Sequence, residues 1–121
     1  MREFTSPGGF KVIVGRNNKQ NDVLSLNVAT EHDVWFHAQG VPGAHVVLRL
    51  QPGKEAPDAD LEFAADLAAF YSKARESTQA PVICTNPKYL RRPKGGKPGQ
   101  VMISSREGVT FQRMGRPARS E

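Results

Sequence analysis

Apolar and polar residues alternate over several short stretches of the chain, a pattern typical of β-strands with one buried face. Residues 2–5 and 10–14 form a first pair of such stretches, and the Ser-Pro-Gly-Gly sequence between them is rich in turn formers. Residues 33–38 and 41–49 form a second pair, connected through residues 39–43. The first half of the chain therefore predicts two pairs of extended segments.

The C-terminal part predicts three more strands. Residues 81–85 contain the apolar run Pro-Val-Ile-Cys and predict a buried strand. Residues 101–105 and 109–113 predict two further strands, and the Ser-Arg-Glu-Gly sequence of residues 105–108 predicts a hairpin turn between them.

Two stretches instead have helical spacing. A short helix is predicted with Asn17 or Asn18 as its N-cap and with Leu24 and Val28 as its apolar stripe. A longer helix begins at Pro57.

In the longer helix we expect Asp58 or Asp60 to be the cap. The spacing predicts a packing face made of Phe63, Leu67, Phe70 and Ala74. It places on the solvated face Glu62, Asp66 and Lys73. Together the elements predict an α+β fold, in which a mostly antiparallel sheet packs against one long and one short helix.

The length of 121 residues fits a single domain, and we place it at residues 1–114, followed by a flexible basic tail at residues 115–121. No stretch is apolar enough to cross a bilayer, and no secretory signal peptide is visible. The single cysteine, Cys84, predicts a buried thiol and no disulfide, which fits a reducing compartment. We therefore expect a cytoplasmic protein without membrane partners.

The net charge of +5 is unevenly distributed. Residues 1–79 contain eight Lys and Arg against ten Asp and Glu, whereas residues 80–121 contain nine against two. Such an asymmetry favours a polyanionic partner, with nucleic acid as the first candidate.

Much of this charge lies in the basic loop, residues 87–99, which contains no acidic residue. Its prolines and glycines predict an irregular, exposed backbone, with Tyr89 free to stack on a base. The alternative is that the loop is a solvated run of charges without a partner. Because no acidic residue offsets the repulsion among its cations, we favour binding of a polyanion. Its cations are Lys88, Arg91, Arg92, Lys94 and Lys97.

One face of the second strand pair carries chemically active side chains. Period-two alternation puts Asp33, Trp35 and His37 on one face of their strand, and His45 and Arg49 share a face of the next. Rings and a guanidinium on a sheet suit stacking on bases and contacts with phosphates. A tryptophan in a strand is nevertheless more often part of the core, and for Trp35 the pattern alone favours that alternative.

A third candidate position precedes the short helix. Arg16 lies beside backbone N–H groups that favour an anion, although a pair with Asp22 is an equally good alternative.

Nothing in the sequence indicates catalysis. The phosphate-binding, zinc-protease and serine-hydrolase motifs are absent. The available ligand types are His37, His45, Asp33 and Cys84, and they lack the paired spacing that is typical of a zinc site. We therefore expect no metal and no cofactor. A hydrolase that uses the two histidines and Asp33 as acid and base is the weakest hypothesis.

Several blocks of the sequence, taken together and in order, resemble the NFACT-R RNA-binding domain family. These blocks are Gly15-Arg16-Asn17 with Gln20-Asn21-Asp22, residues 33–38, residues 42–48, Tyr71-Ser72, and residues 94–101. The resemblance implies binding of tRNA or rRNA, with the large ribosomal subunit as a partner, in ribosome-associated quality control. Ala44 stands where serine is common in the family.

The resemblance adds a set of candidate residues, namely Arg16, Asn17, Asn21, Asp33, Trp35, His37 and His45. Within it we expect Asp33 to orient His37 or His45 and Asn21 to fix the neighbouring loop. With the charge pattern, it predicts a non-catalytic RNA-binding module. Its expected contacts are Arg16, Asn17, Trp35, His37, His45, Arg49 and the five cations of the basic loop. The alternative is an accessory module that docks on a ribosomal or quality-control protein.

Overall fold

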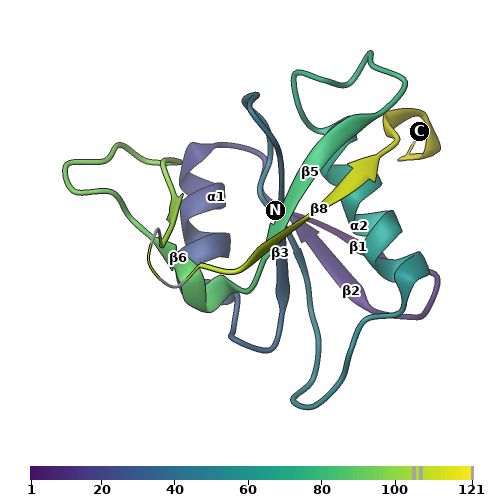
Figure 1. Ribbon diagram of the computed structural model, residues 1–121, viewed down its shortest axis with the longest axis horizontal. Helices are drawn as coiled ribbons and strands as arrows, with labels where there is room; N and C mark the ends of the chain where they lie inside the picture. The colour runs from purple at the N-terminus through teal and green to yellow at the C-terminus, as the bar shows by residue number, and fades with distance from the viewer. Residues whose placement is uncertain (105, 107, 121) are drawn as a thin grey trace.

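The computed structural model describes residues 1–104, 106 and 108–120. Within these residues, one antiparallel sheet has six strands in the order β1-β2-β4-β3-β5-β8 (Figure 1). Their bounds are Arg2–Thr5, Lys11–Val14, Val46–Leu48, Val34–Ala38, Ala80–Thr85 and Thr110–Gly115. The predicted α+β fold is confirmed.

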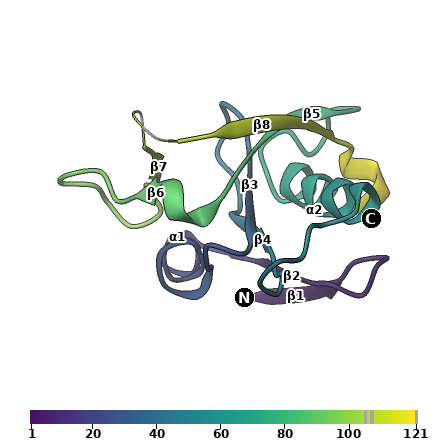
Figure 2. The ribbon, with the colours of Figure 1, turned by 60° about the horizontal axis from the view of Figure 1, so that its bottom comes forward.

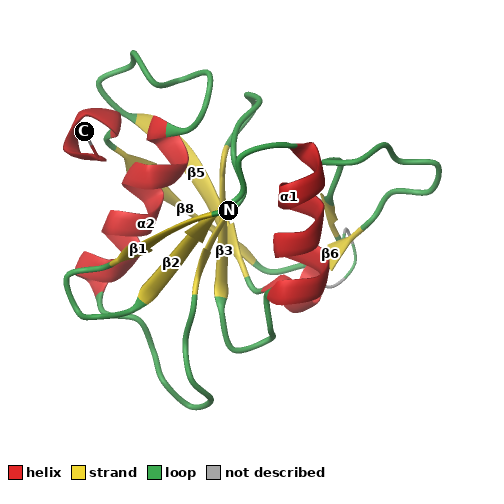
Figure 3. Cartoon of the chain, turned by 180° about the vertical axis from the view of Figure 1, so that it is seen from behind, coloured by secondary structure: helices red, strands yellow, loops and turns green. Residues whose placement is uncertain are grey.

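The two helices lie on opposite sides of β3 and β4 (Figure 2). The long helix α2 spans Asp58–Phe70, and the short helix α1 spans Asn18–Val23 and continues as a π-helix over Leu24–Val28. A small second sheet, β6 (Leu90–Arg91) paired with β7 (Met102–Ile103), lies on the α1 side, and β6 is seen beside α1 in Figure 3. No helix of the described chain is long and apolar enough to span a membrane.

Side chains alternate along β3 as the sequence predicts, and this alternation divides the interior into two cores. Phe36 points to the larger core under α2, whereas Trp35 points to a smaller core with Leu24 of the π-helix. Strand β4 supplies both cores in the same way, with Val46 on one side and Val47 on the other. The α1 face of the sheet is therefore the one that carries the histidines.

The packing face of α2 is the predicted one in part. Leu67 is buried and Phe63 and Ala74 pack against the larger core, but the fully buried positions are Ala64, Ala65, Ala68 and Ala69, and Phe70 is only partly buried. These small side chains let the helix axis approach the sheet closely, as the many alanines of the sequence predict. The N-cap prediction is wrong: Pro57 takes that position, and buried Asp60 accepts a hydrogen bond from the Gly8 backbone N–H at 2.7 Å.

The predicted C-terminal hairpin does not form. β7 pairs with β6, whereas β8 pairs with β5 over its whole length, from Ala80 opposite Gly115 to Thr85 opposite Thr110. Of the predicted turn, residues 105 and 107 lie outside the described residues. The basic loop is also partly regular, because a 3-10 turn at Pro87–Tyr89 and strand β6 precede its irregular part.

The described part of the predicted flexible tail packs against α2 (Figure 1). Gly115 ends β8, and a 3-10 turn follows at Pro117–Ser120, with Pro117 buried. Asp66 holds this turn: it accepts from the Arg116 backbone N–H at 2.8 Å and from Arg119 Nε at 3.1 Å. Asp66 is thus buried, contrary to the solvated position predicted for it, and burial raises the pKa of its carboxyl group.

We expect Asp66→Ala to lower the free energy of unfolding by about 1–3 kcal/mol, because it removes the acceptor of the Arg116 N–H and a charged partner of Arg119. Glu62→Ala is the matched control, since Glu62 also contacts Arg119 from α2 but is more exposed. Its loss should cost less than about 1 kcal/mol. Urea unfolding measures both, and equal losses would contradict an anchoring role for Asp66.

Candidate nucleic-acid interface

Trp35, Ser25 and His45 form a buried hydrogen-bonded chain. Trp35 Nε1 donates to Ser25 Oγ at 2.9 Å, and Ser25 Oγ lies 2.7 Å from His45 Nδ1. Because the indole can only donate, Ser25 Oγ is the acceptor of Trp35 and forms a second hydrogen bond with His45 Nδ1. Trp35 and His45 are each 4% exposed. Trp35 belongs to the smaller core, as the strand pattern alone favours, and neither ring forms an open stacking surface.

The three rings pack closely on one another. Trp35 and His37 stack with their centroids 5.9 Å apart and 8° between planes, and His45 meets each of them edge-on. These rings line a recess of about 410 Å³, the ring slot, closed on its other side by Pro93, Gly99, Gln100 and Val101. The basic loop therefore lies directly over the rings.

Both histidines of the ring slot are held in their neutral forms. Burial lowers the pKa of His37. Hydrogen bonds to the backbone of Ala38 and Gly43 raise it, but burial has the larger effect. Burial and the neighbouring His37 lower the pKa of His45 to about 4. Near neutral pH the ring slot therefore presents uncharged imidazoles rather than cations for phosphate.

Asp33 and Arg49 do not take the predicted positions. Buried Asp33 accepts from the backbone N–H groups of Thr30 and Leu50, each at 2.9 Å, and lies 3.2 Å from Arg49 Nε. It therefore orients neither histidine. Arg49 lies at the other end of β4 from His45, beside a separate pocket that also contains Lys11 and Lys54.

The two predicted asparagines have structural partners. Asn21 Oδ1 accepts from the His45 backbone N–H at 3.1 Å, so it does fix the segment that enters β4. Asn17 is the N-cap of α1, and its Oδ1 accepts from the Gln20 backbone N–H at 2.8 Å. The side chain of Asn18, the alternative cap, makes no hydrogen bond to the described residues.

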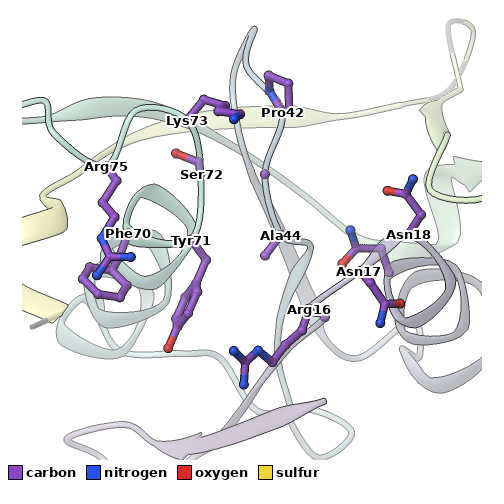
Figure 4. A pocket seen from close by; sticks show the side chains of 13 residues that line it. Arg16, Asn17, Asn18, Pro42, Ala44, Phe70, Tyr71, Ser72, Lys73 and Arg75 are labelled. Atoms are coloured by element: carbon purple, nitrogen blue, oxygen red, sulfur yellow. The ribbon is translucent and has the colours of Figure 1, made fainter.

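A second recess, the cation pocket, brings Arg16 together with residues that the sequence did not single out. It encloses about 470 Å³ between the start of α1 and the segment that follows α2 (Figure 4). Its walls carry Arg16, Lys73 and Arg75 and no carboxylate. The guanidinium of Arg16 has no ion pair in the described chain, because its expected partner Asp22 pairs with Arg92.

Close backbone approach at Gly43 creates this pocket. Gly43 and Ser72 form an antiparallel bridge, and the Lys73 backbone N–H donates to Pro42 O at 2.9 Å. A β-carbon on Gly43 would lie 2.7 Å from Ser72 Cβ. The glycine in the Pro-Gly sequence is the one local signal that a distant segment approaches here.

The basic loop is tied to α1 through Asp22. Asp22 accepts from Arg92 at 2.9 Å and from the Gly99 backbone N–H at 2.8 Å. Burial alone would raise the pKa of Asp22, but these two donors hold it below its usual value. Arg92 is thus an internal partner rather than a free cation.

The remaining loop cations differ in availability. Arg91 donates to the backbone carbonyls of Lys88 and Leu90, and Lys88 lies over the Tyr89 ring at 5.2 Å. Lys94 and Lys97 have no carboxylate within ion-pair distance among the described residues. The loop that follows β6 and carries these two lysines extends on the α1 side of the molecule, away from α2 (Figure 1).

Comparison with known proteins gives a consistent result. Residues 1–105 match the family model described as the NFACT protein RNA binding domain. The chain is 37% identical over 109 residues to the Rqc2 homolog RqcH of Bacillus subtilis (strain 168), covering 90% of this chain and 19% of that protein. It is 42% identical over 102 residues to the Rqc2 homolog RqcH of Streptococcus suis (strain 05ZYH33), covering 83% and 18%.

A solved structure agrees with these matches. The C-terminal part of the fibronectin/fibrinogen-binding protein from Streptococcus suis superposes with a TM-score of 0.82 at 36% identity, over 97% of this chain and 46% of that chain. The chain spans about a fifth of the length of the two curated relatives. The family resemblance seen in the sequence is thereby confirmed.

The buried imidazole of His45 predicts an acid-labile fold. Its folded pKa of about 4 is below the unfolded value, so its contribution to stability is complete above about pH 6.5 and is lost as the pH falls toward 4. At about 1.4 kcal/mol per pKa unit, the loss is of the order of 3 kcal/mol.

Chemical unfolding at pH 7, 5.5 and 4 measures this loss. His45→Gln, which keeps an acceptor for Ser25, should reduce the pH dependence, whereas the exposed His32→Gln should leave it unchanged. If the free energy of unfolding of His45→Gln depends on pH as strongly as that of the wild type, the acid lability does not come from His45.

Proposed function

Because the chain belongs to the NFACT protein RNA binding domain family, we propose that it binds RNA, chiefly through phosphate contacts, and does so without catalysing a reaction. The residues proposed for these contacts are Arg16, Lys73 and Arg75 in the cation pocket and Lys88, Lys94 and Lys97 of the basic loop. The side chains that support this surface from beneath are Trp35, His37, His45 and Asn21. Asp33 and Arg49 pair with each other outside it.

The observation that carries the proposal is the direct contact between the two cationic regions. Gly99 lies so close to α1 that a β-carbon there would be 2.6 Å from Asn18 Oδ1, and Asn18 lines the cation pocket. Gly99 itself lines the ring slot. The cation pocket, α1 and the basic loop therefore form one band, along which a polyanion can run.

The buried carboxylate Asp22 lies within this band without breaking it. Its charge is matched by Arg92, so the outward-facing cations are not neutralised. Since phosphates attract cations independently of base sequence, such a band suits structured RNA with limited base readout. We propose tRNA or rRNA in the cytoplasm, in the setting of ribosome-associated quality control and with the large ribosomal subunit as a partner.

Two contacts support a non-catalytic role. A hydrolase that combines the histidines with Asp33 is disfavoured, because Asp33 is engaged by two backbone N–H groups and Arg49. His45 Nδ1 is likewise committed to Ser25. The imidazoles are therefore arranged as internal hydrogen-bonding groups.

Strand β8 favours protein docking as a second candidate function. It is an edge strand, and Val109, Phe111 and Met114 are 65%, 45% and 42% exposed. Exposed apolar side chains along an unpaired edge are typical of protein contacts. This surface contains none of the cations of the RNA-binding band.

RNA binding predicts a steep salt dependence. About four to six phosphate contacts give a log-log slope of about −3 to −5 for labelled tRNA, and removing two contacts should make it shallower by about 1.4 to 1.8. We expect this change in the double variant Lys94→Ala, Lys97→Ala. The charge-matched control is Lys11→Ala, Lys54→Ala, which alters the separate pocket near Arg49. A wild-type affinity that does not respond to salt would count decisively against the proposal.

Pull-down of ribosomes tests the second candidate. If RNA mediates capture, nuclease treatment should release the domain, and Phe111→Ser should have no effect. Capture that survives nuclease and is lost in Phe111→Ser would favour docking through β8 instead.

A further inference from the structure

The cation pocket differs from the rest of the band in having a built aromatic wall. Tyr71 packs edge-on against Phe70, with centroids 4.9 Å apart and 82° between planes. The Tyr71 hydroxyl accepts from Arg2 at 2.8 Å, and Arg75 lies over the Phe70 ring at 3.9 Å. These contacts hold the wall in place, so little side-chain entropy remains to be lost when a ligand binds.

The opposite wall carries polar groups without internal partners. The side-chain amide of Asn18 makes no hydrogen bond and the guanidinium of Arg16 makes no hydrogen bond or ion pair within the described residues, and both line the pocket together with Tyr71 (Figure 4). An amide offers a donor and an acceptor to a base edge, and a guanidinium offers donors to phosphate. The pocket therefore combines an aromatic side chain with an amide and a cation.

Size and shape exclude a paired duplex from this pocket. About 470 Å³ is within the range of pockets that hold one small ligand. A base within a helix has both faces covered by its neighbours, so only an unstacked base can lie against Tyr71. Unpaired bases are commonly recognised in this way, by stacking on aromatic side chains with hydrogen bonds to the base edges.

We propose that the cation pocket receives one unpaired nucleotide of the bound RNA, with its base against Tyr71 and its phosphate at Arg16 and Lys73. This inference rests on the proposed RNA binding and adds a local requirement to it: a bulged or looped nucleotide next to a helical segment. The basic loop then contacts the neighbouring phosphates, and the unpaired nucleotide fixes the register of the RNA.

Two hairpin RNAs that differ by a single bulged nucleotide test this inference. The wild type should bind the bulged RNA about tenfold more tightly, which is within the range for one stacked base. Tyr71→Leu should abolish this preference while retaining the affinity for the paired hairpin. Phe111→Leu is the matched control, because it removes an exposed aromatic ring on β8 and should keep the preference. Lys94→Ala, Lys97→Ala should weaken binding of both RNAs equally.

A fluorescent base at the bulge gives a second readout that needs no variant. Stacking on Tyr71 should quench 2-aminopurine when wild-type protein is added, and Asn18→Ala should weaken the bulge preference if Tyr71→Leu fails to fold. Equal, salt-dependent affinity for both hairpins without quenching would overturn the nucleotide pocket but leave the proposed function standing. Absence of binding to either hairpin at low salt would overturn both.

Discussion

The hydroxyl of Ser25 joins the π-helix to the sheet, and the positions of both cationic regions depend on this junction. It accepts from Trp35 on β3 and forms a hydrogen bond with His45 at the entrance of β4, so three segments share one buried polar atom. Loss of a partner in such a chain leaves a buried group unsatisfied, which costs more than a surface hydrogen bond contributes. The rotation of α1 on the sheet is thereby fixed.

Once α1 is fixed, the surface groups follow from it. The turn before α1 places Arg16 opposite Tyr71, and the body of α1 places Asp22 where it receives Arg92 and the Gly99 N–H. A π-helical segment such as Leu24–Val28 is rare and is frequently found at functional sites. The α2 face of the same sheet packs a core made mainly of alanine and valine side chains with Phe36.

The parts of the fold that sequence analysis predicts correctly are those set by local periodicity. Alternation assigns Trp35 and Phe36 to opposite faces of β3, and Asn17 is found as the cap of α1. The failures involve partners far away in the chain. Asp66 has the spacing of a solvated position, yet it meets Arg116 fifty residues later. No periodicity in α2 carries that information.

The candidate site divides in the same way. Composition locates the basic loop, strand alternation and the helix start locate the histidines and Arg16, and the resemblance adds Asn17. The contribution of Lys73 and Arg75 depends on the bridge between Gly43 and Ser72, for which the glycine after Pro42 is the one local signal. No pattern reveals that Arg92 is used internally, because its partner Asp22 lies 70 residues earlier. A count of charges treats all cations of the basic loop alike, whereas their contacts in the structure show which of them have internal partners.

In the proposed RNA-binding band this distinction would separate affinity from selectivity. Lys94 and Lys97 carry single charges on long side chains in an irregular loop, so under the proposal they would attract phosphates of any base sequence. Arg16 and Tyr71 lie on backbone that the Asn17 cap and the α2 terminus hold fixed. Contacts with phosphate carry no sequence information, whereas contacts with bases do. If the cation pocket receives a base as proposed, the basic loop would contribute mainly affinity and the pocket would contribute selectivity.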